Sequence, residues 1–515
     1  MSRKATAKLT RLLRAATSSE KRYMRIRLTR SRSGEPDKYL QLYEALAAGQ
    51  IEDDHALIGR IYGQTERLSV KYANLKQYLY ESLLDALYDF DKGARARHEL
   101  DRQFRHISVL FKRGLYKDCD EALQKAMRIA EQYEYFTHQL EAVKWQKLLA
   151  YTRMDANFLH KNIERLQALE NKALQQIQNQ SAYQSIFLQL YLAVKKEGGL
   201  SAPEARARVD ALVRSELFTG PEKALSHTAK VLYYRSMNLY YYIVQQTEQF
   251  HESGRQLIEL LESKPHFLRE GLTDYIAALS NYILSCGLSR RYGEVRATLD
   301  KLRRLQPITQ DDRRKIHRQY YSNLFALNIY CGEFENAKNE MRACQQGLEA
   351  DTADDFATAS FFFQYACICF GCGDYDEALG YLNDWMRQPR SVEREDLQSV
   401  ARIMLLIIYY ESNKLLILDA ALRASRRFVR SRNRLYQLER QIFALMGKLL
   451  NAESERRKRL IFRHTYAKIQ PLLNRQEAVA LIQTLDLDAW IRSKLEGQSF
   501  ARIVRQKWRE SANSA

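Results

Sequence analysis

The feature that most limits how this chain can fold is a motif that recurs every 41 to 42 residues. In each copy an aromatic residue is followed three positions later by a short side chain. The short residues Val295, Ala337 and Ala378 are separated by 42 and 41 positions, and Ser253 lies 42 positions before Val295. Apolar residues with helical spacing stand on both sides of each copy, which predicts two helices per unit.

Composition agrees with a chain of helical hairpins. There are only 20 glycines and 7 prolines in 515 residues, and this scarcity excludes β-sandwich and propeller folds, which need frequent turns. Neither helix of a unit can bury its apolar stripe alone. Several units must therefore stack side by side to form a continuous core.

One copy of the motif carries a resemblance to a known family. The stretch Gly373-Asp-Tyr375-Asp-Glu-Ala378-Leu379, with Pro389 after it, resembles the second half of a tetratricopeptide (TPR) repeat. The resemblance implies an all-α, TPR-like α-solenoid, and it covers about residues 100–430. The period departs from the 34 residues of TPR units, so longer helices or connections are expected.

Three regions are predicted from these patterns. Residues 1–92 form a helical N-terminal domain with a basic start, residues 93–430 form the repeat array, and residues 431–515 form a basic helical C-terminal region. Near the start, Thr17 and Glu20 have the spacing of a capping box, which predicts a helix that begins there.

Amide side chains recur in one register of the repeat. Asn281, Asn323 and Gln364 are separated by 42 and 41 positions, and Asn238 lies one position earlier in the preceding unit. The TPR resemblance implies that this position faces the inner groove, where amides could bind the backbone of an extended peptide. The alternative is that these amides only cap or bridge neighbouring helices.

Positive charge gathers at the two ends of the chain. The net charge is +19, and residues 1–32 contain eleven Lys or Arg against one acid. Helical spacing predicts cationic faces that could bind a polyanion. The candidate residues are Lys4, Lys8 and Arg11 near the start and Arg423, Arg426, Arg427, Arg430 and Arg434 towards the end. The alternative is that these cations only solvate helical surfaces.

The sequence carries no familiar catalytic or metal-binding motif. Cys367, Cys369 and Cys372 lack a nearby histidine, and Cys286 falls in the same repeat position as Cys369, so the cysteines are interpreted as packed residues. We expect no enzymatic activity, no metal and no cofactor. No apolar run reaches the ~20 residues of a membrane span, and we expect a cytoplasmic protein.

These patterns predict a non-enzymatic scaffold that binds a peptide or protein segment of unknown identity in its groove. Two alternatives stay open. The first is a nucleic-acid-associated regulator that contacts phosphates, or an acidic partner, through its basic termini. The second is a peripheral membrane adaptor that uses the basic amphipathic helix at the N-terminus.

Overall fold

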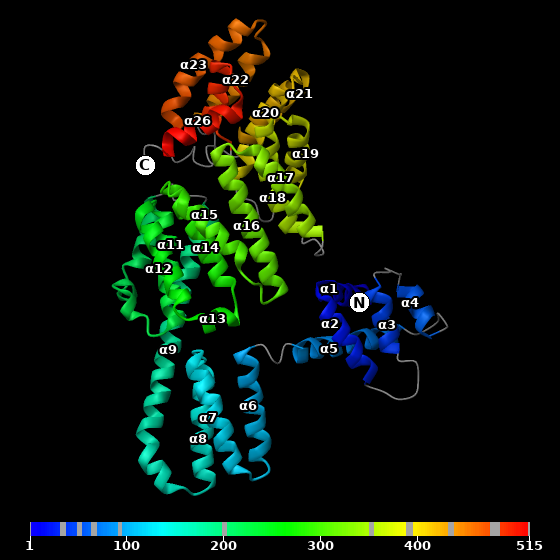
Figure 1. Cartoon of the computed structure of the whole chain (residues 1–515), viewed down its shortest axis with the longest axis vertical. Coiled ribbons are helices and arrows are strands. Elements are labelled where there is room, and N and C mark those ends of the chain that lie inside the picture. Colours follow the sequence, from blue (N-terminus) through cyan, green and yellow to red (C-terminus); the bar gives the residue numbers. More distant parts are fainter. Residues whose placement is uncertain are drawn as a thin grey trace.

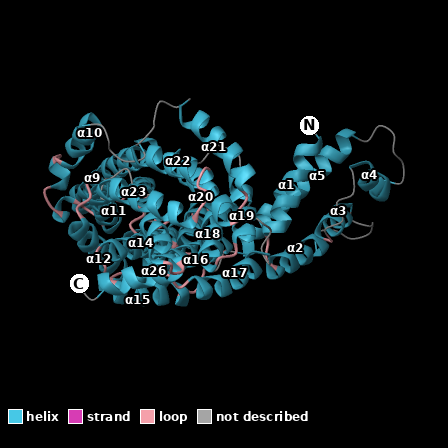
Figure 2. Cartoon of the chain, turned by 90° about the horizontal axis from the view of Figure 1, so that it is seen from above, coloured by secondary structure: helices cyan, strands magenta, loops and turns pink. Residues whose placement is uncertain are grey.

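The fold is all-α, and the described part of the chain contains no strand (Figure 2). A computed structural model describes residues 2–30, 38–48, 54–62, 69–90, 95–197, 203–349, 355–387, 395–430, 437–473 and 485–512. Arg434 and Pro389 lie outside these residues. Lys4 and Arg430 lie in helices, but their side chains are not among those described.

The first five helices share a core of their own. They are α1 (Ser2–Ala15), α2 (Ser18–Arg30), α3 (Lys38–Ala47), α4 (Asp54–Tyr62) and α5 (Ser69–Phe90). Leu9 and Leu13 of α1 and Leu79 and Leu83 of α5 are buried in this core. The capping box predicted at the start of α2 is confirmed, since Glu20 accepts from the Thr17 backbone and the Glu20 backbone donates to the Thr17 hydroxyl.

The next helices pack in chain order. α6 (Ala96–Phe111), α7 (Tyr116–Gln132) and α8 (Phe136–Thr152) lead into the 42-residue α9 (Ala156–Glu197), which packs on α8 and then on α11 (Figure 1). The connection between α9 and α11 contains α10 (Pro203–Val213) and two short 3₁₀ helices, Glu216–Phe218 and Pro221–Lys223. This stretch interrupts the regular period.

Five helix pairs follow, and the members of each pair pack against each other. The pairs are α11 (His227–Ile243) with α12 (Thr247–Glu262), α14 (Thr273–Leu288) with α15 (Tyr292–Arg304), α16 (Gln310–Cys331) with α17 (Phe334–Glu349), α18 (Asp355–Cys372) with α19 (Tyr375–Arg387), and α20 (Glu395–Glu411) with α21 (Leu415–Arg430). The short α13 (Pro265–Glu270) joins the first two pairs. Each pair also contacts the next one.

The short residue of the sequence motif is buried between the two helices in four of the five pairs. Ser253, Val295, Ala337 and Ala378 are all at most 4% exposed. Each lies in the first turn or two of the second helix, opposite the end of the first helix. The short side chains therefore let the two helix backbones approach each other closely, as the repeat predicts.

A left-handed backbone residue marks the turn inside each of these pairs. The positions are Gln245, Arg290, Gly332, Gly373 and Asn413, all with φ between 53° and 88°. Such a residue stops the first helix and lets its last carbonyl groups accept hydrogen bonds from the turn. Glycine adopts this conformation without a steric penalty and asparagine tolerates it, so Gly332, Gly373 and Asn413 have residue types that a sequence search for turns finds, whereas Gln245 and Arg290 do not.

The last helices return to the middle of the chain. They are α22 (Gln437–Leu450), α23 (Glu455–Leu473), α25 (Leu487–Glu496) and α26 (Phe500–Ala512). α26 packs on α16 and α18, where the Arg505 guanidinium Nε donates to the Gly332 carbonyl at 3.0 Å. Phe500 contacts the rings of Phe334 and Phe370. The C-terminal helix thus covers the turns of two helix pairs (Figure 1).

Alanine substitutions at Gly332 and Gly373 distinguish the effect of backbone strain at a turn from the effect of losing the contact with α26. A Cβ at Gly373 meets no atom within 4 Å, so Gly373→Ala should lower the free energy of unfolding by about 1–2 kcal/mol through the left-handed backbone alone. A Cβ at Gly332 would lie 2.9 Å from the Arg505 backbone nitrogen. Gly332→Ala should therefore cost more, and only this variant should speed hydrogen exchange in α26, measured by mass spectrometry. Equal exchange in α26 of both variants would contradict the docking contact.

Candidate functional site

Three of the amides predicted to line a groove lie on the first helices of three consecutive pairs. Asn281 on α14 is exposed and makes no side-chain hydrogen bond with the described residues. Asn323 on α16 donates to the Ser280 hydroxyl of α14 at 2.9 Å, and Gln364 on α18 donates to the Ser322 carbonyl of α16 at 2.9 Å. The last two amides therefore bridge neighbouring first helices.

The same bridges leave acceptor atoms unused. The side-chain carbonyl oxygens of Asn323 and Gln364 accept no hydrogen bond from the described part of the chain, and both side chains are partly exposed. Because the amide nitrogen is held by the neighbouring helix, the orientation of the oxygen is fixed. We call Asn281, Asn323 and Gln364 the amide row.

Asn238 does not belong with the amide row. It is 1% exposed, and its side-chain nitrogen donates to the Phe250 carbonyl and the Ser253 hydroxyl of α12 at 2.9 and 3.2 Å. The shift by one position in the sequence is a turn of about 100° on a helix, which directs this amide into the pair. The residue is inaccessible to a ligand, and its assignment to the groove is corrected accordingly.

The arginines of α21 are only partly available to a polyanion. Arg423 pairs with Asp419 at 2.9 Å, and Arg426 donates to the Phe443 carbonyl of α22 at 3.0 Å. Arg427 is exposed and has no partner among the described residues. The predicted row of free guanidinium groups is therefore broken by internal contacts that the sequence pattern could not show.

The cations of α1 face solvent while its apolar side is already covered. Lys8 and Arg11 are exposed, and Leu9 and Leu13 are buried against α3, α4 and α5. A helix that lies on a membrane must bury its apolar face among lipids. In this fold that face belongs to the core of the N-terminal helices.

A stronger cationic surface lies on α23. Arg456, Arg459 and Arg463 are exposed, occupy one helical face and form no ion pair within 4 Å among the described residues, although Glu455 lies close enough for the charge of Arg459 to lower its pKa. Arg457 and Lys468 extend this surface. The opposite side of the helix carries Phe462 and Ile469, both at most 2% exposed. We call these five residues the α23 cationic face.

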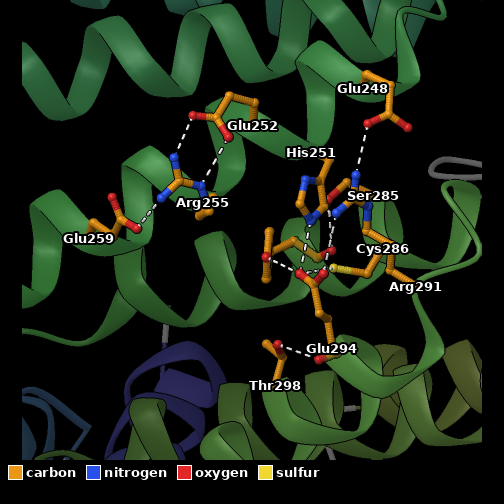
Figure 3. A network of polar contacts seen from close by, with 11 residues as sticks. Glu248, His251, Glu252, Arg255, Glu259, Ser285, Cys286, Arg291, Glu294 and Thr298 are labelled. Atoms are coloured by element: carbon orange, nitrogen blue, oxygen red, sulfur yellow. Dashed lines mark hydrogen bonds and ion pairs between the residues drawn. The ribbon is translucent and has the colours of Figure 1, made fainter.

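A polar cluster between α12, α14 and α15 has the most connected geometry. Its hub is the carboxylate of Glu294, at the start of α15 (Figure 3). Oε2 lies 2.9 Å from His251 Nε2 and 3.8 Å from Cys286 Sγ, and it also accepts the hydroxyl proton of Tyr282. The other oxygen, Oε1, lies 3.6 Å from Arg291, which in turn binds Glu248 at 3.0 Å.

Burial and hydrogen bonding set the protonation of this cluster. Burial by itself would raise the pKa of Glu294, but hydrogen bonds from Tyr282 and His251 outweigh it and hold the pKa below the ordinary 4.5. Burial, together with the negative charge of Glu294, raises the pKa of Cys286 to about 12. The cysteine is 0% exposed and protonated near neutral pH, so it is a poor nucleophile.

A surface cavity of about 510 Å³ opens beside the cluster. It is lined by charged side chains of α12, among them Glu248, Glu252 and Arg255, and by Arg291 immediately before α15, and it reaches His251 and Glu294. Gly254 brings α12 close to α14 here, since a Cβ at this position would lie 3.2 Å from the Tyr282 ring.

The sequence alone does not reveal this cluster. Its pattern indicates a packed Cys286, and no histidine lies near Cys367, Cys369 and Cys372. His251 lies 43 positions before Glu294, which is about one repeat. The only pattern in the sequence that could have brought these two residues together is the packing of successive units at that period.

Comparison with known proteins identifies no relative: no family model, no curated protein and no solved structure shows a significant match. Among the described residues, no helix is both long and apolar enough to cross a membrane.

Removing the charge at the hub should weaken the packing of α15. Glu294→Gln should lower the free energy of unfolding at pH 7 by about 1–2 kcal/mol, a moderate loss because the carboxylate is 40% exposed. The pKa of Glu294 is lower in the folded protein than in the unfolded chain. The difference in free energy of unfolding between Glu294→Gln and the unaltered protein is therefore complete above pH 4.5, and it disappears as the pH falls through the pKa of the folded state. Urea titrations across pH measure both effects.

Glu248→Gln provides the control. This carboxylate is 69% exposed and binds Arg291, so its loss should change the free energy of unfolding by less than about 0.5 kcal/mol. If both variants behave alike, Glu294 is not the hub of the cluster.

Proposed function

We propose that this protein is a non-enzymatic scaffold whose helix pairs form a TPR-like superhelix and hold an extended peptide segment of a partner protein. The amide row carries the proposal. Extended peptides have unpaired backbone N–H groups on both sides, and side-chain carbonyl oxygens at one position of successive units can accept from them.

The arrangement of the amide row supports this function more than a purely structural one. A bridging amide needs only its nitrogen to join two helices, yet Asn323 and Gln364 each present the oxygen at a partly exposed surface. Asn281 bridges nothing in the described chain. Preorganised acceptors lose little conformational entropy when a peptide binds.

Ion pairs on the first helices favour a peptide backbone over a free C-terminal carboxylate as the ligand of the amide row. On α11, Arg235 is paired with Asp274 of α14 at 2.6 Å, and on α16, Lys315 pairs with Asp311 and donates to Thr273. A carboxylate would have to compete with these acids for the cations. The backbone of an internal segment needs no such cation.

Selection of peptides tests the proposal directly. A phage-displayed library of linear peptides is selected on the purified protein, and the affinities of enriched peptides are measured by fluorescence polarisation. Changing Asn281, Asn323 and Gln364 together to Ala should weaken binding by at least about tenfold, because three hydrogen bonds worth ~0.5–1.5 kcal/mol each are lost.

The matched control changes three amides of the second helices. Asn336 and Gln346 on α17 and Asn383 on α19 are replaced by Ala, and peptide affinity should stay within about twofold. Asn281→Ala alone removes no bridge between helices. Any loss of peptide affinity in this variant therefore cannot come from unfolding. Equal affinities of the two triple variants would overturn the proposal.

A second candidate function is nucleic-acid binding through the α23 cationic face. Five exposed cations on one solvent-facing helix, only one of which lies near an acid, suit a row of phosphates. The covered apolar side of α1 supports this candidate over attachment to a membrane.

The salt dependence of binding tests the second candidate. In filter-binding titrations with duplex DNA and with RNA, Arg456, Arg459 and Arg463 changed to Glu should weaken binding. On duplex DNA, the slope of log K against log salt should become shallower by about 3, one unit per lost phosphate contact. In the control variant, Lys172, Arg304 and Arg342 are changed to Glu; these three cations are exposed on other helices. A loss of the same size in the control would exclude a specific role for α23.

A further inference from the structure

The Glu294 cluster has the donor atoms of a transition-metal site. An imidazole nitrogen, a thiol sulfur and a carboxylate oxygen converge from three different helices, and these three atoms lie within 4.8 Å of one another. This combination of soft and hard donors is one that Zn²⁺ accepts, and zinc binds cysteine, histidine and glutamate in proteins. We propose that His251, Cys286 and Glu294 form a Zn²⁺-binding site.

The distances leave room for an ion after small side-chain movements. Tetrahedral zinc, with bonds of about 2.0–2.3 Å, separates its ligand atoms by roughly 3.3–3.7 Å. The present separations from Glu294 Oε2 are 2.9 Å to His251 Nε2 and 3.8 Å to Cys286 Sγ. These two separations lie on either side of the required spacing, and all three donor atoms lie within 4.8 Å of one another, so an ion needs only small adjustments of the side chains.

The surroundings provide an approach and an outer layer of contacts. Cys286 is fully buried, but Glu294 is 40% exposed and faces the cavity between α12 and α15, through which an ion can enter. A water molecule in that cavity can take the fourth position, as in zinc sites with three protein ligands. Tyr282 and Arg291 contact the carboxylate oxygens and limit their movement, as outer contacts of metal ligands do.

The corresponding position of another repeat lacks this donor set. Cys369 occupies the position of Cys286, and Glu377 occupies that of Glu294. The position of His251 is taken by Glu335, and the ammonium of Lys338 binds Glu377 at 2.7 Å. In that repeat a glutamate takes the place of the imidazole ligand, so the set of His, Cys and Glu donors is incomplete.

Binding would join three helices and release a proton. The Cys286 thiol loses its proton to solvent as the zinc–sulfur bond forms, because a metal binds the thiolate. Affinity should therefore rise with pH. An ion held by α12, α14 and α15 binds the folded chain and not the unfolded one, so it should also raise the melting temperature.

Cobalt titration of the full-length protein tests the site. Adding CoCl₂ to protein freed of metal by a chelator should produce a near-ultraviolet thiolate-to-cobalt charge-transfer band, which ZnCl₂ then removes by displacement. Cys286→Ser should abolish the band. His251→Gln and Glu294→Gln keep the thiol, and each should weaken Co²⁺ binding by at least about tenfold.

Cys369→Ser is the matched control, since this cysteine is equally buried and occupies the same repeat position. Its cobalt spectrum and zinc-induced increase in melting temperature should equal those of the unaltered protein. Circular dichroism checks that each variant is folded. The proposal is overturned if no band forms, if the band persists in Cys286→Ser, or if Cys369→Ser loses it as well.

Discussion

Mutual burial of amphipathic helices is the constraint on which the rest of this structure depends. Each first helix has one side for its own partner and another for the next pair, and neither side is covered until both neighbours are present. The short residue at the crossing sets how closely the backbones approach. Bulk at Ala337 or Ala378, both 0% exposed, would separate a pair and displace its neighbours too.

Much of this arrangement could be predicted from the sequence because its causes are local and periodic. The spacing of Val295, Ala337 and Ala378 located the helix pairs, and Thr17 with Glu20 located a helix start. The pattern was weaker where the period breaks. One continuous helix of 42 residues, α9, stands where a hairpin would be expected, and neither a glycine turn nor the short-residue motif indicates it in the sequence.

The site residues show a sharper limit. The repeat period predicts which residues occupy the same position in successive units. A shift of one residue, however, turns a side chain by about 100° around the helix and changes what it faces. Asn238 lies one position from the amide register and is buried, while Asn281 is exposed. The Glu294 cluster depends on contacts between units, so His251 and Cys286 meet only after the helices have packed.

The position of α26 alters how the whole array should respond to stress. In a linear repeat protein each unit senses only its nearest neighbours, and the ends can fray independently. Here a hydrogen bond joins Arg505 to Gly332, 173 positions away in the chain. Local opening of the middle units must release the C-terminal helix as well, so this part of the molecule should unfold as one cooperative block. Its folding must close a long loop, which slows folding.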